Sequence, residues 1–383
     1  MSASLSLHPL TFLEDGEEVV VGRRDIDSYA YFPPDGAALV RQLGAGRSPE
    51  QAAAWYCDTY GEAIDIDEVV ETLRELRFVR DADAPAVADR PVRWQHLGRA
   101  LFSPYAAALY AIAVAAAVAA CLRDPALVPR AADVRFTDSL LICGVALFAG
   151  QALLALVHES FHVLAGRRLG LRTSVHISRR FYYAVYETRL DGLVSVPRRR
   201  RYLVILAGLL ADLLVVATLI LLASATSGVT AGLCLALAFT TLPRIMWQFL
   251  FHLRTDVYYL ITTALGLDDL DAAARARLRE ILRLAPAVNA LALGARDRRA
   301  ARWYAPLMVA GYALSVTMLV LVIVPLAWHF FGPALHWLAG EPAGSQVLGS
   351  AALLAITLFE LLLALAVALR ERRAIRQSAG SLA

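Results

Sequence analysis

The chain has 383 residues, of which 58% are hydrophobic, with a mean hydropathy of +0.54 and a formal net charge of only +3. This composition excludes an ordinary soluble enzyme and points to the membrane. It also argues against a nucleic-acid-binding protein, because the arginine-rich segments adjoin apolar runs, where arginine sets topology and meets anionic headgroups.

The amino-terminal part is polar and mixed in charge, so we expect a cytoplasmic domain over residues 1–89 and no cleavable signal peptide. Residues 17–22 and 28–32 are β-branched or aromatic and predict two short strands around a turn. Pro33 and Pro34 then mark the entry to a helix that runs to Leu43.

Two further helices are predicted in this domain. Ser48, Pro49 and Gln51 form a capping-box start for a helix ending near Tyr60. Asp65 or Asp67 caps the next helix, and residues 78–79 begin a closing strand. Three helices with a small sheet give a winged-helix outline, and residues 81–89, rich in Ala, Asp and Pro, predict a linker.

Residues 18–79 resemble the PqqD-like domains that bind leader peptides of ribosomally made, modified peptides, through their hydrophobic pattern and their PPDG and DIDE segments. The resemblance implies that a leader peptide is held as an added strand at a sheet edge. By this analogy the edge is formed by Glu18, Val19, Val20 and Val21. The alternative is a small scaffold that only docks onto the membrane part or onto a partner.

Beyond this domain, residues 90–383 contain apolar runs of the roughly 20 residues needed to cross a bilayer. We predict six spans, over residues 101–122, 139–165, 202–223, 229–251, 304–330 and 347–369. The fold class is therefore mainly α, a polytopic membrane protein with a small α+β winged-helix-like domain at its amino terminus. Residues 268–302, charged and rich in alanine, predict an interfacial pair of helices.

The arginines predict the orientation of these spans. The loop between the second and third spans is strongly basic, which places it in the cytoplasm by the positive-inside rule. Alternation of the spans then puts both termini in the cytoplasm. Cys57, Cys121, Cys143 and Cys234 lack CxxC spacing and are interpreted as packing residues.

The second predicted span contains the sequence HESFH, in which His158, Glu159 and His162 interrupt an apolar helix. Residues four apart lie on one helix face, so both histidines can bind one ion with Glu159 beside them. Charged side chains in a membrane helix cost about 2.5–3.5 kcal/mol each on insertion scales, so they require a reason such as a bound divalent ion. Mutual pairing between helices is the less favoured alternative.

Residues 149–270 resemble the site-2-protease class of intramembrane zinc proteases, particularly its bacterial peptide-processing members. The resemblance rests on HESFHVLAG, on Ala207, Gly208 and Asp212, and on Asp256 in the sequence DVYYL, where Val257 replaces the usual glycine. It implies one zinc ion with Asp256 as the third protein ligand. His252, four residues earlier, is a rival ligand.

Two further polar residues lie at similar depths in neighbouring spans. Asp212 and Arg244 are each about ten residues from a cytoplasmic span end, which predicts a buried ion pair. Glu360 in the last span is an alternative partner. Simple pairing between helices is favoured over direct catalysis, although contact of Asp212 with substrate remains open.

These features lead to three functional hypotheses. In the first, Glu159 acts as general base in zinc-dependent cleavage of a membrane-associated precursor peptide, with daptide-type peptides as suitable substrates. The segment over residues 179–188 has strand character and would offer an edge to the unwound substrate or simply lie at the membrane surface. The second hypothesis is regulated cleavage of a membrane-bound signalling protein, and the third is a non-catalytic peptide-binding scaffold or exporter component.

Overall fold

The computed structural model describes residues 5–80, 92–180, 183–284, 294–324 and 347–380, together with residues 328, 332, 335, 336 and 339. The chain divides into two compact units. The first comprises residues 1–98, 166–174 and 189–201, and the second comprises the remaining chain. The first unit thus includes short segments beyond the predicted boundary at residue 89.

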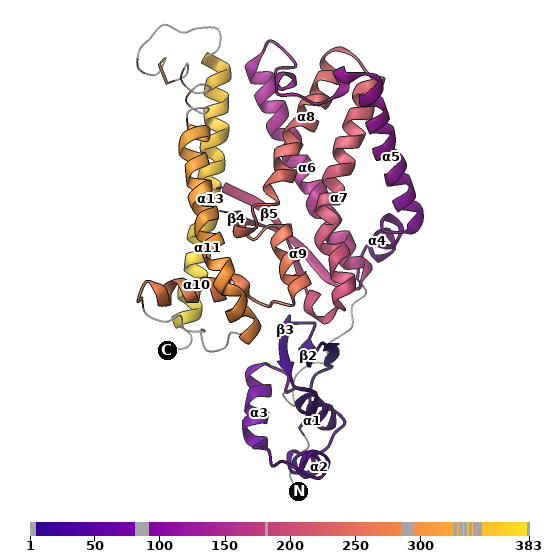
Figure 1. Cartoon of the computed structure of the whole chain (residues 1–383), viewed down its shortest axis with the longest axis vertical. Coiled ribbons are helices and arrows are strands. Elements are labelled where there is room, and N and C mark those ends of the chain that lie inside the picture. Colours follow the sequence, from indigo (N-terminus) through magenta and orange to yellow (C-terminus); the bar gives the residue numbers. More distant parts are fainter. Residues whose placement is uncertain are drawn as a thin grey trace. The chain divides into compact units, whose positions relative to one another are not determined.

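The first unit contains a three-stranded antiparallel sheet and three helices (Figure 1). The strands are β1 (Thr11–Asp15), β2 (Glu18–Arg23) and β3 (Ser28–Phe32), and the helices are α1 (Pro34–Gly44), α2 (Pro49–Tyr60) and α3 (Ile66–Glu75). Val21, Leu39, Leu43, Leu73 and Phe78 are fully buried and form the centre of the core between sheet and helices. The sequence patterns predicted β2, β3 and all three helices, but not β1.

Local sequence explains where the helices begin. The Ser48 hydroxyl accepts the Gln51 N–H while the Gln51 side chain accepts the Ser48 N–H, so the predicted capping box is confirmed. Asp65, rather than Asp67, caps α3 by accepting two backbone N–H groups. The predicted closing strand is reduced to a single bridge between Leu7 and Val79.

The prediction that Glu18, Val19, Val20 and Val21 form a sheet edge is wrong. These residues belong to β2, which is the central strand and pairs with β1 on one side and with β3 on the other. Val20, for example, lies opposite Leu13 and Tyr31. Because its backbone groups already bond on both sides, β2 has no edge to offer to a peptide.

The remaining segments of the first unit are joined to the sheet by polar contacts. The buried Asp15 carboxylate lies 2.6 Å from Arg198 Nε and 3.6 Å from Arg201. Asp27 accepts the Gly192 N–H at 2.6 Å. Residues 189–201 are therefore part of this unit's fold.

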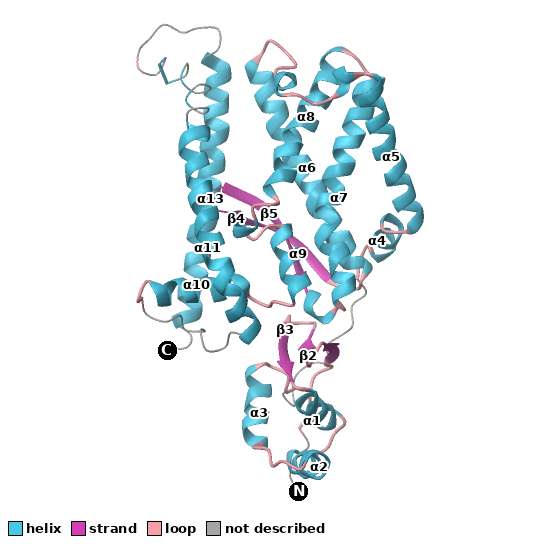
Figure 2. Ribbon diagram, in the orientation of Figure 1, coloured by secondary structure: helices cyan, strands magenta, loops and turns pink. Residues whose placement is uncertain are grey.

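The second unit is almost wholly helical (Figure 2). The helices that lie wholly or partly in it are α4 (Gln95–Leu101), α5 (Pro104–Arg123), α6 (Leu140–Arg168), α7 (Arg198–Ala225), α8 (Gly228–Trp247), α9 (Asp256–Leu265), α10 (Leu270–Ile281), α11 (Ala295–Met318) and α13 (Val347–Gly380). Three-residue or four-residue 3₁₀ turns are η1 (Pro125–Leu127), η2 (Ala131–Val134), η3 (Leu193–Ser195) and η4 (Phe251–Leu253), and η6 (Leu319–Ile323) is a π-helical continuation of α11.

Among the described residues, six helices are long and apolar enough to cross a membrane, which confirms the predicted number of spans. They comprise Pro104–Arg123, Leu140–Arg168, Arg198–Ala225, Gly228–Trp247, Ala295–Leu321 and Gly349–Arg370. Large apolar side chains such as Leu109, Ile112 and Leu362 are 62–64% exposed, as expected for helices that face lipid. The chain is a multi-pass membrane protein.

Several predicted span boundaries differ from those observed, including those of the fourth and fifth spans. The fourth span ends at Trp247, four residues early, because the chain leaves helical geometry there. The fifth span begins with α11 at Ala295, so the second predicted interfacial helix is the first part of that span, whereas α10 is a separate helix as predicted. Residues 285–293 and the predicted linker at 81–89 lie outside the described residues.

Between α6 and α7 the chain forms the antiparallel pair β4 (Arg172–Arg180) and β5 (Tyr183–Asp191). The strand character predicted for residues 179–188 is confirmed for the described part of this hairpin. The four cysteines are free, with Cys57 exposed, Cys121 partly exposed, and Cys143 and Cys234 buried.

Candidate metal centre

His158 and His162 lie one turn apart on α6, and their rings face the same point. Both residues are buried, with 5% and 6% of their surface exposed. Their Nε2 atoms are 3.2 Å apart. The i, i+4 spacing of the sequence therefore brings the two imidazole groups together inside a membrane-spanning helix, as predicted.

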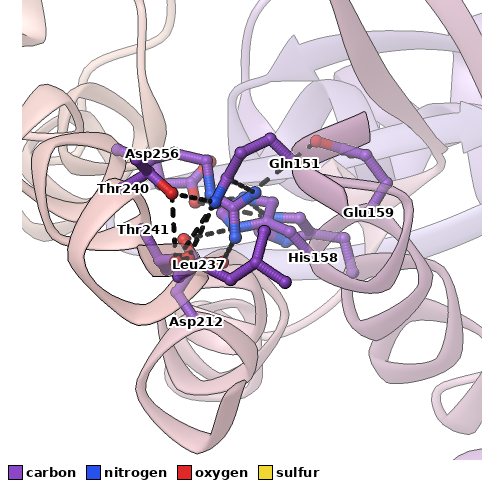
Figure 3. A network of polar contacts seen from close by, with 10 residues as sticks. Gln151, His158, Glu159, Asp212, Leu237, Thr240, Thr241 and Asp256 are labelled. Atoms are coloured by element: carbon purple, nitrogen blue, oxygen red, sulfur yellow. Dashed lines mark hydrogen bonds and ion pairs between the residues drawn. The ribbon is translucent and has the colours of Figure 1, made fainter. Parts of the chain in front are cut away.

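Asp256 supplies the third group. Its Oδ2 atom lies 3.2 Å from His162 Nε2 and 3.4 Å from His158 Nε2. One ligand atom from each of the three residues lies within 4.8 Å of the other two, which makes this trio a candidate metal site. Figure 3 shows Asp256 and His158 pointing toward one another, although they come from different helices.

The route of the chain after α8 explains how Asp256 reaches the histidines. The helix ends at Trp247, and Arg254 adopts φ +57°, which reverses the chain before α9 begins at Asp256. Gln248 holds this turn, because its carbonyl accepts the Thr255 hydroxyl at 2.6 Å and its side chain accepts the Asp256 N–H at 3.1 Å. A helix continuing through Phe251 would carry Asp256 farther from the histidines, so the unwound segment is what brings it to them.

Hydrogen bonds on the other ring nitrogens fix both tautomers. His162 Nδ1 lies 2.8 Å from the carbonyl oxygen of Val204, and His158 Nδ1 lies 3.0 Å from Asp212 Oδ2. A carbonyl or carboxylate oxygen only accepts, so each Nδ1 carries a proton, and when the rings are neutral each Nε2 keeps its lone pair for a metal ion. Both lone pairs then point at the same place as the Asp256 carboxylate.

The Asp256 carboxylate is negatively charged in this setting. Burial raises the pKa of Asp256, but attraction to the rings of His162 and His158, which are positively charged when protonated in the absence of metal, outweighs burial and lowers the pKa below its ordinary value. Asp256 Oδ2 is itself buried and has no hydrogen-bond partner among the described residues. A carboxylate oxygen and two imidazole nitrogens gathered in one buried place form a donor set that one divalent cation fits.

Gly208 on α7 leaves room for that cation. A Cβ atom at this position would lie 2.3 Å from the Nε2 atoms of both His158 and His162. That separation is close to the roughly 2.0–2.1 Å of a zinc–nitrogen bond, so a side chain here would occupy the space of the ion. The glycine noted in the sequence as part of an Ala-Gly pair therefore has a steric role.

Glu159 lies beside this trio. Its Oε2 atom accepts the Thr188 hydroxyl of β5 at 2.6 Å, and its Oε1 atom is 4.0 Å from His158 Nε2. The side chain is mostly buried and is not one of the three clustered ligands. This is the arrangement of a carboxylate that can exchange a proton with water next to a metal ion.

The predicted pair of Asp212 and Arg244 is confirmed. Arg244 donates to Asp212 Oδ1 at 2.5 Å, and it also donates to Gln151 Oε1 at 3.3 Å. Glu360, the alternative partner, is exposed on α13 and forms no ion pair with Arg244 in the part of the chain that the structure describes, so Asp212 is the partner of Arg244. Asp212 has no exposed surface and bonds to both His158 and Arg244.

The alternative ligand His252 lies elsewhere. It is on η4, where its Nε2 atom bonds to Ser315 Oγ at 2.9 Å and its ring packs on Tyr312 of α11. Burial lowers the pKa of His252, so the ring is neutral at pH 7. The chain reversal after His252 directs Asp256, and not the histidine, toward α6.

Sequence reasoning missed three contributors, namely Gln151, Thr188 and Gln248. Gln151 carried a usable signal, because it is a polar residue seven positions before His158 and thus on the same helix face. Thr188 and Gln248 act through tertiary contacts, and their sequence context gave no signal. No protein-family model, curated protein or solved structure matches this chain.

We expect the purified chain to bind one divalent ion, and His158→Ala, His162→Ala and Asp256→Ala each to lose it. The affinity should fall by more than the roughly 10–100-fold typical of removing only a ligand's hydrogen-bond partner. Metal content after equilibration with zinc or cobalt, measured by mass spectrometry, tests this expectation. His252→Ala is the control and should keep the ion; loss of metal from this variant alone would restore His252 as the ligand.

Replacement Gly208→Ala should also abolish metal binding, because the new methyl group would displace both ligating nitrogens. The matched control is Gly144→Ala in α6, where a Cβ atom would lie equally close, 2.3 Å, to the Leu353 side chain. Both variants crowd two helices, but only the first should lose metal. Equal metal content in native and Gly208→Ala proteins would contradict the steric role of this glycine.

Proposed function

We propose that this chain is an intramembrane zinc metalloendopeptidase that cleaves a membrane-associated precursor peptide. The single observation that carries the proposal is the convergence of His158, His162 and Asp256 beside Glu159 within apolar, membrane-spanning structure. Two histidines and a carboxylate with a neighbouring glutamate are the donor set and base of hydrolytic zinc sites. The resemblance to site-2-protease-type enzymes supports the same chemistry.

Each residue has a defined task in this proposal. When bound, zinc polarises the scissile carbonyl and acidifies the attacking water. Glu159 takes a proton from that water and later delivers it to the leaving amine. The Thr188 hydroxyl holds the Glu159 carboxylate in place, and burial of the site excludes bulk water, which strengthens these interactions.

The proposed substrate is a precursor peptide whose leader is removed during maturation of a ribosomal natural product. The support is the PqqD-like sequence of residues 18–79 on the same chain as the metal site. With β2 in the centre of its sheet, a leader added as a strand would pair with the outer side of β1 or β3. Residues 28–32 of β3 are only half-buried and have side chains that a peptide can contact.

The proposed location is the bacterial cell membrane, with both termini in the cytoplasm. Arginines at the cytoplasmic ends of the spans favour this orientation by the positive-inside rule. The metal site would then be near the cytoplasmic side, where a leader peptide is first available.

The decisive experiment compares native protein with Glu159→Gln in membranes that contain a candidate precursor peptide. Loss of the general base should reduce cleavage by about 10²–10⁴-fold while the metal content is unchanged. Products are identified by mass spectrometry. Ser160→Ala is the control, because Ser160 is an exposed neighbour on the same helix that bonds only to Leu156 of its own turn.

Full peptide maturation by Glu159→Gln would overturn the proteolytic function and indicate a peptide-binding scaffold. Cleavage of a membrane-bound signalling protein, with no cleavage of precursor peptides, would retain the chemistry and overturn the substrate.

The orientation can be tested with Cys57, which is exposed in the amino-terminal domain. In a variant carrying Cys121→Ala, Cys143→Ala and Cys234→Ala, a membrane-impermeant maleimide should label Cys57 only after the membrane is permeabilised. Adding Ala132→Cys to a Cys57→Ala version should give labelling in intact cells, because the loop after the first span is predicted to lie outside. The reverse pattern would invert the topology.

A further inference from the structure

We propose that Asp212 and Arg244 are positioning residues of the metal centre, acting through His158, and not merely an ion pair that joins two helices. The proposal rests on the metal binding that underlies the proposed function. It explains how the ring of His158 is oriented toward the ion and why Arg244 lies within a membrane-spanning helix.

The two oxygens of Asp212 have separate tasks. Oδ2 lies 3.0 Å from His158 Nδ1, and Oδ1 accepts from Arg244 at 2.5 Å. Asp212 has no exposed surface, so neither bond competes with solvent. The Asp212 carboxylate thus orients the His158 ring with one oxygen and is held in place by Arg244 through the other. Metal-ligating histidines commonly have such a hydrogen-bond partner on the second ring nitrogen.

Arg244 is fixed in turn by a third helix. Arg244 donates to Gln151 Oε1 at 3.3 Å. Gln151 Nε2 in turn donates to Thr240 Oγ1 at 2.7 Å and to the Leu237 carbonyl at 3.2 Å, and Figure 3 shows these three residues together. Gln151 precedes His158 by two turns on the same helix face. The network therefore connects α6, α7 and α8 immediately beside the ligand atoms, so the ring of His158 is held by a connected set of side chains.

The two histidines are anchored differently. His162 donates to a neutral backbone carbonyl, that of Val204, whereas His158 donates to a charged carboxylate. A carboxylate partner raises the basicity of the ligating nitrogen, but it also adds a negative charge to a site that already holds Glu159 and Asp256. An isolated extra charge here would cost several kcal/mol.

Arg244 removes this excess charge. The positive charges of Arg244 and one divalent cation together equal the negative charges of Glu159, Asp212 and Asp256, with both histidines neutral. A neutral sum is the least costly state for a buried group of charges in a membrane. The guanidinium thus allows a carboxylate to serve as the partner of His158 without unbalancing the loaded site.

The test uses two double variants that differ in one group only. Asp212→Asn with Arg244→Gln removes both charges but keeps an oxygen that can accept from His158 Nδ1. Asp212→Leu with Arg244→Gln has similar volume and no acceptor. Changing Arg244 in both variants avoids an uncompensated guanidinium in the membrane.

Zinc affinity of the full-length protein in detergent is measured by competition with a chromophoric chelator, and thermal unfolding of the chelated proteins checks their folding. The Asn/Gln variant should bind zinc within a few-fold of its native affinity, and the Leu/Gln variant about 10–100-fold more weakly at comparable stability. Equal affinities of these two variants would overturn the positioning role. Failure of the native chain to bind zinc would overturn the metal site as well, whereas tight zinc binding without peptide cleavage would overturn only the proposed function.

Discussion

The structure depends on the meeting of three electron-rich atoms in a place closed to solvent. Two imidazole nitrogens and one carboxylate oxygen lie within hydrogen-bond range of one another, and when both rings are neutral no proton lies between them. Without a cation such an arrangement is repulsive in a medium of low dielectric constant. A divalent ion at this candidate site would turn the repulsion into attraction.

The helix α7 serves this centre with one face. Val204, Gly208 and Asp212 follow one another at intervals of four residues, and they respectively anchor His162, leave space beside both rings, and anchor His158. The two histidines meet them in the opposite order along α6, so the helices are antiparallel there. One face of an otherwise apolar span therefore supplies a backbone acceptor for His162, space for an ion beside both rings, and a carboxylate acceptor for His158.

The position at which helix α8 ends is what allows Asp256 to reach the metal centre. Its last turn gives way at Trp247 to a segment that reverses direction and starts α9 with Asp256. Backbone groups freed by such a break in a membrane must find partners inside the protein. The carbonyl and side chain of Gln248 supply two of these hydrogen bonds, to Thr255 and Asp256. These bonds offset part of the free energy lost when the helix ends, at the position where Asp256 is placed.

The sequence by itself determined the membrane character, the number of spans, the winged-helix outline and the pair of histidines. These follow from short-range patterns, since apolar length, capping residues and i, i+4 spacing act within one element. It also favoured Asp256, through a resemblance, and paired Asp212 with Arg244 by depth. Only the tertiary structure decided between Asp256 and His252, because the left-handed turn at Arg254 sets their directions.

Strand order, likewise, is a property of pairing and not of composition. The strand β1 was missed, and with it the fact that Glu18 to Val21 occupy the centre of the sheet. The roles of Gln151, Thr188 and Gly208 arise from contacts with residues that are from 29 to 93 positions away or on another helix. Chain patterns specify which residues share a helix face, but the packing of one helix against another specifies which atoms meet.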